Sequence, residues 1–170
     1  MTKLIGAILI LLGGLSFSLC ILHRQRRRMD LLSQLDPELE TLACELASGE
    51  GSLPEIMQLL SENGGPGART FFRQAASRMV RLGEESFREL WEESVCGIAA
   101  SLDPAELQAL CALGPILGRY PREKQLEAID QCRRTLAGRA SELRKQWPVQ
   151  IKLSLGLGLG GTLLVVLILL

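Results

Sequence analysis

The densest group of chemically active side chains in this sequence is a set of glutamates. They are Glu84, Glu85, Glu89, Glu92 and Glu93. Two neighbouring carboxylates can act as a general acid and a general base only when a pocket drives their pKa values apart. This spacing instead favours a solvated acidic face of a helix. We therefore interpret Glu85, Glu89 and Glu92 as a candidate docking surface for a basic partner.

Few other residues are placed for catalysis or for metal binding. His23 is the only histidine, and the five cysteines show no Cys-x-x-Cys spacing. A zinc site draws on several histidines or cysteines, and a Ser-His-Asp arrangement would have to use His23, which lies beside an apolar run. No phosphate loop of the GxxxxGK[ST] type is present. We expect no catalytic residue, metal site, cofactor or small-molecule substrate, and we interpret the cysteines as small core or lipid-facing residues.

Two long apolar runs occupy the ends of the sequence, at Leu4–Leu22 and Ile151–Leu170. A helix of about twenty residues rises about 30 Å, which matches the hydrocarbon core of a bilayer. No small-x-small cleavage site follows the first run. We therefore expect an uncleaved transmembrane helix over residues 1–23 and a second transmembrane helix over residues 149–170.

Basic side chains predict the orientation of the two spans. Arg24, Arg26, Arg27 and Arg28 form a collar directly after the first run, within a helical extension expected over residues 24–35. Short segments rich in Lys and Arg stay on the cytoplasmic side of a membrane. The central region is therefore predicted to be cytoplasmic, with both termini on the far side. Because the collar lies against a membrane span, we expect it to bind no nucleic acid.

Between the spans, residues 36–148 are predicted to form a helical bundle. Apolar residues recur at helical spacing, and no run alternates as a strand would. The expected fold is all-α, with about five or six helices between an N-terminal and a C-terminal transmembrane helix. From Asp30 to Trp147 the sequence holds 13 Lys or Arg and 19 Asp or Glu, so this region is net acidic.

Caps and breakers predict where these helices begin and end. Asp36-Pro37 is predicted to end one helix and to begin the next, and Ser52-Leu-Pro-Glu55 has the pattern of a capping box. Further helices are expected over about 68–82, from about 84, from Asp103-Pro104 and over about 122–147. Pro148 is expected to kink or interrupt the passage into the second span.

The order of several short motifs resembles the stage III sporulation protein AB family of endospore-forming bacteria. The motifs lie at 39–49, 52–55, 90–94, 113–125 and 152–156, after an N-terminal span with a basic exit. The residues that carry the resemblance are Gly49, Leu53, Pro54, Trp91, Leu113, Gly114, Leu117, Gly118, Gln125 and Gly156. The sequence departs from the family pattern at Pro115, at Tyr120-Pro121 and at Pro148.

The resemblance implies a helical cytoplasmic domain similar to the platform protein F of type II secretion and type IV pilus systems. It further implies a non-enzymatic assembly component in the mother-cell membrane, facing the forespore, within a channel complex required for sporulation. The implied partners are the membrane, a secretion-type ATPase encoded in the same operon and other stage III channel subunits. Two alternatives stay open: a platform subunit of a pilus- or secretion-type assembly outside sporulation, and a small membrane-bound enzyme that uses the Glu84–Glu93 carboxylates.

Overall fold

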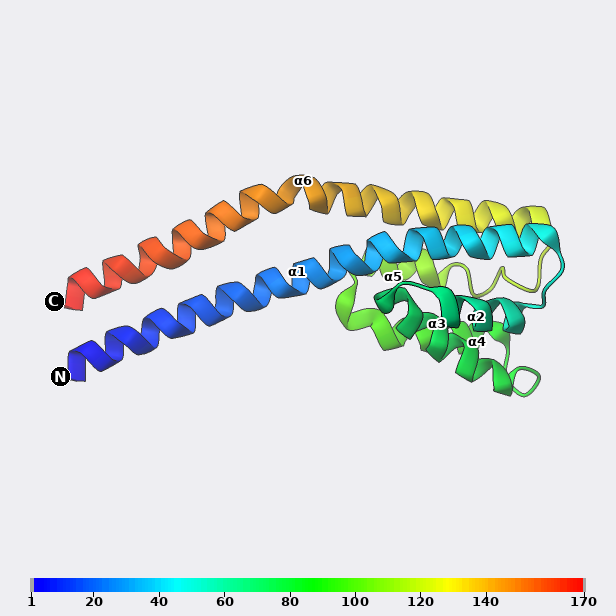
Figure 1. Ribbon diagram of the computed structural model, residues 1–170, viewed down its shortest axis with the longest axis horizontal. Helices are drawn as coiled ribbons and strands as arrows, with labels where there is room; N and C mark the ends of the chain where they lie inside the picture. The colour runs from blue at the N-terminus through cyan, green and yellow to red at the C-terminus, as the bar shows by residue number, and fades with distance from the viewer. Residues whose placement is uncertain (1, 170) are drawn as a thin grey trace. The chain divides into compact units, whose positions relative to one another are not determined.

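The computed structural model describes the backbone of residues 2–169 and the side chains of residues 23–145 (Figure 1). Within that part the chain is all-α and holds six α-helices and two short 3-10 helices, which confirms the all-α part of the predicted fold class. In chain order these are α1 (Thr2–Ser48), α2 (Leu53–Asn63), α3 (Pro66–Arg78), η1 (Met79–Arg81), α4 (Phe87–Ile98), η2 (Ala99–Ser101), α5 (Pro104–Cys111) and α6 (Arg122–Leu169).

The chain divides into two units, one formed by Arg28–Ser141 and the other by Met1–Arg27 with Glu142–Leu170. The predicted transmembrane segments belong to the second unit, and their side chains lie outside the described residues, as does Gly156. Within residues 23–145, the part of the chain whose side chains are described, no helix is both long enough and apolar enough to cross a bilayer. The predicted limits of the helical bundle, at residues 36 and 148, stay a prediction.

Helix α1 continues through Pro37, so the predicted break at Asp36-Pro37 is wrong. A proline inside a helix costs about 3 kcal/mol through its missing amide and its steric clash. A continuous stripe of buried leucines, Leu31, Leu32, Leu35, Leu39 and Leu42, runs along α1 on both sides of the proline. Burying each such side chain stabilises the fold by about 1.5–3 kcal/mol, so the stripe outweighs the local cost of Pro37.

Asp36 has a tertiary partner in place of the predicted capping role. Its carboxylate accepts a hydrogen bond from Arg133 Nε of α6 at 3.0 Å, and Glu40 accepts one from Arg133 Nη2 at 2.9 Å. Arg133, which interrupts the apolar face of α6 in the sequence, therefore ties α6 to α1. Helix α6 is likewise uninterrupted at Pro148 and extends to Leu169.

Local caps begin three of the shorter helices. The amide of Ser52 donates to Glu55 Oε2 at 2.7 Å, as the predicted capping box requires. The amide of Asp103 donates to Glu106 Oε2 at 2.9 Å, at the helix start that Asp103-Pro104 predicts. Helix α4 begins at Phe87, slightly later than expected, because Ser86 is its N-cap and accepts a hydrogen bond from the Glu89 amide. The helix expected over 68–82 ends at Arg78 and tightens into η1.

An aromatic cluster fills the core between α3, α4 and α5. The Trp91 side chain is fully buried and its Nε1 donates to the Leu110 carbonyl at 2.7 Å. The Phe71 ring meets it edge-on with ring centroids 5.2 Å apart. A buried indole needs such an acceptor, so this single hydrogen bond sets how α5 lies against α4.

A buried ion pair joins α1 to the first turn of α5. Arg28 Nη2 donates to Glu106 Oε1 at 2.6 Å and Arg28 Nε donates to Oε2 at 3.1 Å, and Arg28 also pairs with Asp103. The Glu106 side chain is fully buried and that of Arg28 is 16% exposed. Arg28 therefore acts in the tertiary structure, whereas Arg24, Arg26 and Arg27 of the predicted collar are exposed.

We expect Arg28→Met to lower the free energy of unfolding by about 3–5 kcal/mol, because it leaves the buried Glu106 carboxylate without its counter-charge. The double variant Arg28→Met/Glu106→Leu should recover much of this loss, since no unpaired charge remains. Urea unfolding of the full chain in detergent, followed by Trp91 fluorescence in a Trp147→Phe background, measures both. The control Arg134→Met, in an exposed pair with Asp130, should cost at most about 1 kcal/mol. Equal effects of Arg28→Met and this control would contradict the buried-pair argument.

The cysteines differ in exposure more than the sequence suggests. Cys132 is buried and Cys111 is half-buried, but Cys44 and Cys96 are exposed, so the predicted core or lipid-facing position is wrong for these two. Both lie on solvated faces of their helices. Burial raises the pKa of the Cys132 thiol to about 12, which keeps it protonated well above neutral pH.

In single-cysteine variants at pH 8 we expect maleimide to label Cys132 more than about tenfold more slowly than Cys44, because only the thiolate reacts. The ratio should fall toward one in urea. Mass spectrometry of labelled chains over time gives both rates. Equal rates in the folded protein would mean that α6 does not bury Cys132 as the structure describes.

Candidate functional site

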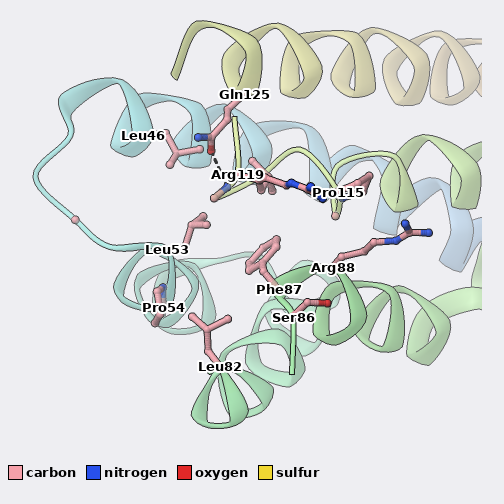
Figure 2. Close-up of a pocket in the computed structure, with 14 residues that line it drawn as sticks. Leu46, Leu53, Pro54, Leu82, Ser86, Phe87, Arg88, Pro115, Arg119 and Gln125 are labelled. Carbon is pink, nitrogen blue, oxygen red and sulfur yellow. Dashed lines mark hydrogen bonds between the residues drawn. The ribbon is translucent and has the colours of Figure 1, made fainter. Parts of the chain in front are cut away.

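A groove of about 590 Å³ opens between the end of α1, the first turn of α2, the start of α4 and the segment that joins α5 to α6 (Figure 2). All of its walls belong to the unit Arg28–Ser141. Its lining residues are Leu46, Gly51, Leu53, Pro54, Leu82, Ser86, Phe87, Arg88, Gly114, Pro115, Leu117, Gly118, Arg119 and Gln125. The size is that of a site for a small ligand or for a few side chains of a partner.

Most of the motif residues that the sequence analysis singled out meet at this groove. Those that line it are Leu53, Pro54, Gly114, Leu117, Gly118 and Gln125. Two of the other motif residues pack in the core behind the groove lining. Trp91 lies against Gly114, and Leu113 is buried. Nothing in the order of residues indicates that positions 53 and 118 adjoin, because only the fold brings α2 against the segment between α5 and α6.

Two glycines allow the close packing of the groove wall. Gly118 has a φ of +74°, and a Cβ atom there would lie 2.8 Å from Leu53 Cδ1. A Cβ atom at Gly114 would lie 3.1 Å from Trp91 Cδ1. Only glycine adopts the first conformation without strain, so the Leu-Gly-x-x-Leu-Gly spacing has a structural cause at both of its glycines.

Gln125 holds the segment that carries these glycines. Its Oε1 accepts a hydrogen bond from the Gly118 amide at 3.1 Å, and its Nε2 donates to the Tyr120 carbonyl at 2.6 Å. The first turn of α6 thereby fixes the turn that ends the groove. Pro115 and Pro121 lie in this irregular segment, outside both α5 and α6, so they break no helix.

Gly49 lies outside the groove, at the end of α1. It ends α1 with a φ of +73°, and Arg122 packs where a Cβ atom would stand. Arg122 Nη1 donates to the Ala47 carbonyl at 2.7 Å and so satisfies one of the free carbonyls at the end of α1. Gly49 therefore allows the C-terminus of α1 and the N-terminus of α6 to meet.

The floor of the groove is apolar. The Phe87 ring stacks on Trp91 with centroids 5.8 Å apart and an interplanar angle of 21°. Figure 2 shows this ring directed into the groove, with Leu53 and Leu82 nearby. The Leu82 side chain is 41% exposed, so it presents apolar surface to solvent at the groove. An apolar surface that polar residues surround is one feature of protein contact sites.

The described residues that line the groove include two arginines but no aspartate, glutamate, histidine or cysteine. Arg88 Nε donates to Glu92 Oε1 at 2.7 Å, and this hydrogen bond raises the pKa of Arg88. Arg119 is exposed, and within residues 23–145 no hydrogen bond or ion pair engages its guanidinium. The groove is thus apolar at its floor and positive at its rim.

The predicted acidic surface lies beside the groove, and each of its carboxylates has a partner within the chain. Glu85 pairs with Arg81 at 2.7 Å, and Glu92 pairs with Arg88 at 2.7 Å. Glu89 accepts a hydrogen bond from the Ser86 amide at 2.9 Å, and this contact lowers the pKa of Glu89. The face is therefore a mixed arginine and glutamate network rather than an uncompensated acidic patch.

We expect Gly118→Ala to lower the free energy of unfolding by about 1–3 kcal/mol, because alanine is strained at a positive φ and its methyl group meets Leu53. Gly138→Ala is the control. Gly138 lies within α6 with open space around it, so alanine there should stabilise the chain by about 0.5–1 kcal/mol. Urea unfolding measures both, and a shift of the same sign in the two variants would contradict the geometry.

Comparison with known proteins gives a consistent match. The family model described as "Stage III sporulation protein AB (spore_III_AB)" matches residues 3–170. A solved structure described as "Stage III sporulation protein AB (SpoIIIAB)" is similar, with a TM-score of 0.64, 21% sequence identity, and coverage of 71% of this chain and 96% of that chain. At that identity the likeness shows the fold alone. No curated protein matches the sequence.

Proposed function

This chain belongs to the stage III sporulation protein AB family, a family of sporulation proteins, and we propose that it acts as a non-enzymatic membrane platform in the channel complex between mother cell and forespore. The observation that carries the proposal is the groove. Residues from separate family motifs converge on one apolar surface that lacks the carboxylates, histidine and cysteine on which acid–base or nucleophilic catalysis usually relies. Such a surface suits the binding of another protein.

Anchoring is the second part of the proposal. The apolar runs at residues 1–23 and 149–170 would hold the helical unit at the mother-cell membrane, with the unit in the cytoplasm and both termini on the far side. The exposed side chains of Arg24, Arg26 and Arg27 support a position at an anionic membrane surface. Arg28 pairs with Glu106 inside the helical unit, so we assign the membrane contact to the other three arginines of the collar.

The proposed partner at the groove is the secretion-type ATPase of the same operon, with other stage III channel subunits completing the assembly. We expect Leu82→Asp to reduce recovery of that ATPase at least about fivefold when the tagged full chain is purified in detergent from sporulating cells, because a charge would face the apolar floor. Leu59→Asp is a matched control, since Leu59 is 36% exposed but lies on α2 outside the groove. Equal recovery with the two variants would count against the groove as the recruiting surface.

The acidic surface is a separate arm of the same experiment. Reversal of charge at Glu85, Glu89 and Glu92 should change recovery little if the groove carries the contact, because these carboxylates already have partners in the chain. If the ATPase is lost only in this triple variant, the contact that recruits it lies on the glutamate face of α4 and not in the groove.

A further inference from the structure

We propose that the groove binds an amphipathic helical segment of a partner protein, with apolar side chains on its floor and an acidic side chain of that segment paired to Arg119. This inference rests on the proposed function, because it assumes that the groove is a contact site. It goes further by stating the chemistry of the occupant.

The apolar part of the occupant follows from the floor. Phe87, Leu53 and Leu82 line the groove with their apolar side chains, and Leu117 and Pro115 add further apolar lining. About 590 Å³ holds a few side chains but no folded domain. A helix inserts such a set from one face, at positions i, i+3 or i+4 and i+7, when it lies in a groove.

The acidic part follows from the charge of the rim. The region around the groove is net acidic in sequence, yet the described groove lining holds two arginines and no carboxylate. Glu92 already occupies Arg88, whereas the Arg119 guanidinium has no partner within residues 23–145. A carboxylate beside a desolvating apolar floor would form two parallel hydrogen bonds with that guanidinium.

Other anions fit the groove less well. The first turns of α2 and α4 adjoin it, but the Glu55 and Glu89 carboxylates already bond the backbone there. These hydrogen bonds lower the pKa values of both carboxyl groups, so each helix start already holds an anion of its own chain. The helix ends therefore offer little to a phosphate, and selectivity for negative charge rests on Arg119.

The test uses the full chain in nanodiscs and a displayed library of random short peptides. Selection should enrich peptides with apolar residues at helical spacing and one Asp or Glu. With Arg119→Glu the acidic residue should be replaced by Lys or Arg, and a synthetic peptide of the original consensus should bind about tenfold more weakly. Arg134→Glu, an exposed change on α6 away from the groove, should leave the consensus and its affinity unchanged.

Three outcomes would overturn the inference. They are a consensus without an acidic residue, equal affinity of the consensus peptide for the wild-type and Arg119→Glu chains, and undiminished affinity of that peptide for the Leu82→Asp variant. Self-association of the full chain that Arg119→Glu abolishes in analytical ultracentrifugation would assign the groove to a second copy and would also overturn it. If the peptides fail but recovery of the ATPase still depends on Leu82, the platform role stands and only the acidic occupant is wrong. If the peptides bind as expected but recovery of the ATPase does not depend on Leu82, the inferred occupant of the groove is supported and the proposed recruitment of the ATPase through the groove is contradicted.

Discussion

The burial of Trp91 is the constraint on which the rest of the helical unit depends. Its indole donates to the Leu110 carbonyl of α5, meets Phe71 of α3 edge-on and lies 3.1 Å from the place where a Cβ atom at position 114 would stand, so a glycine there packs closely on the ring. Phe87 stacks on its other side and forms the floor of the groove. One side chain thus connects the interior packing to the surface that we assign to partner binding, because the same ring fixes both.

Buried and half-buried charges hold the long helices around this core. Arg28 joins α1 to the capped start of α5 through Glu106, and Arg133 joins α6 to α1 through Asp36 and Glu40. Apolar packing has little directional preference, whereas a guanidinium that makes two hydrogen bonds to carboxylates fixes the register of one helix against another. These pairs therefore determine how the three helices align, while the leucine stripe of α1 supplies most of the stabilising burial.

The proposed platform role combines the groove with the two apolar runs that we propose as membrane anchors. A helical unit that presents a groove with an apolar floor and an arginine rim is suited to binding a segment of another protein. The neighbouring glutamates Glu85 and Glu92 pair with Arg81 and Arg88, so they leave no uncompensated acidic patch beside the groove.

Local signals in the sequence determined the helical fold class and the starts of α2 and α5, because caps and helical periodicity act within a few residues. The resemblance to the family identified the motif glycines without revealing what they do. Only the tertiary structure decided that α1 passes through Pro37, that Arg28 serves Glu106, and that Leu53 meets Gly118. Each of these depends on packing between segments far apart in sequence, where the energy of burial exceeds the local preference of a single residue.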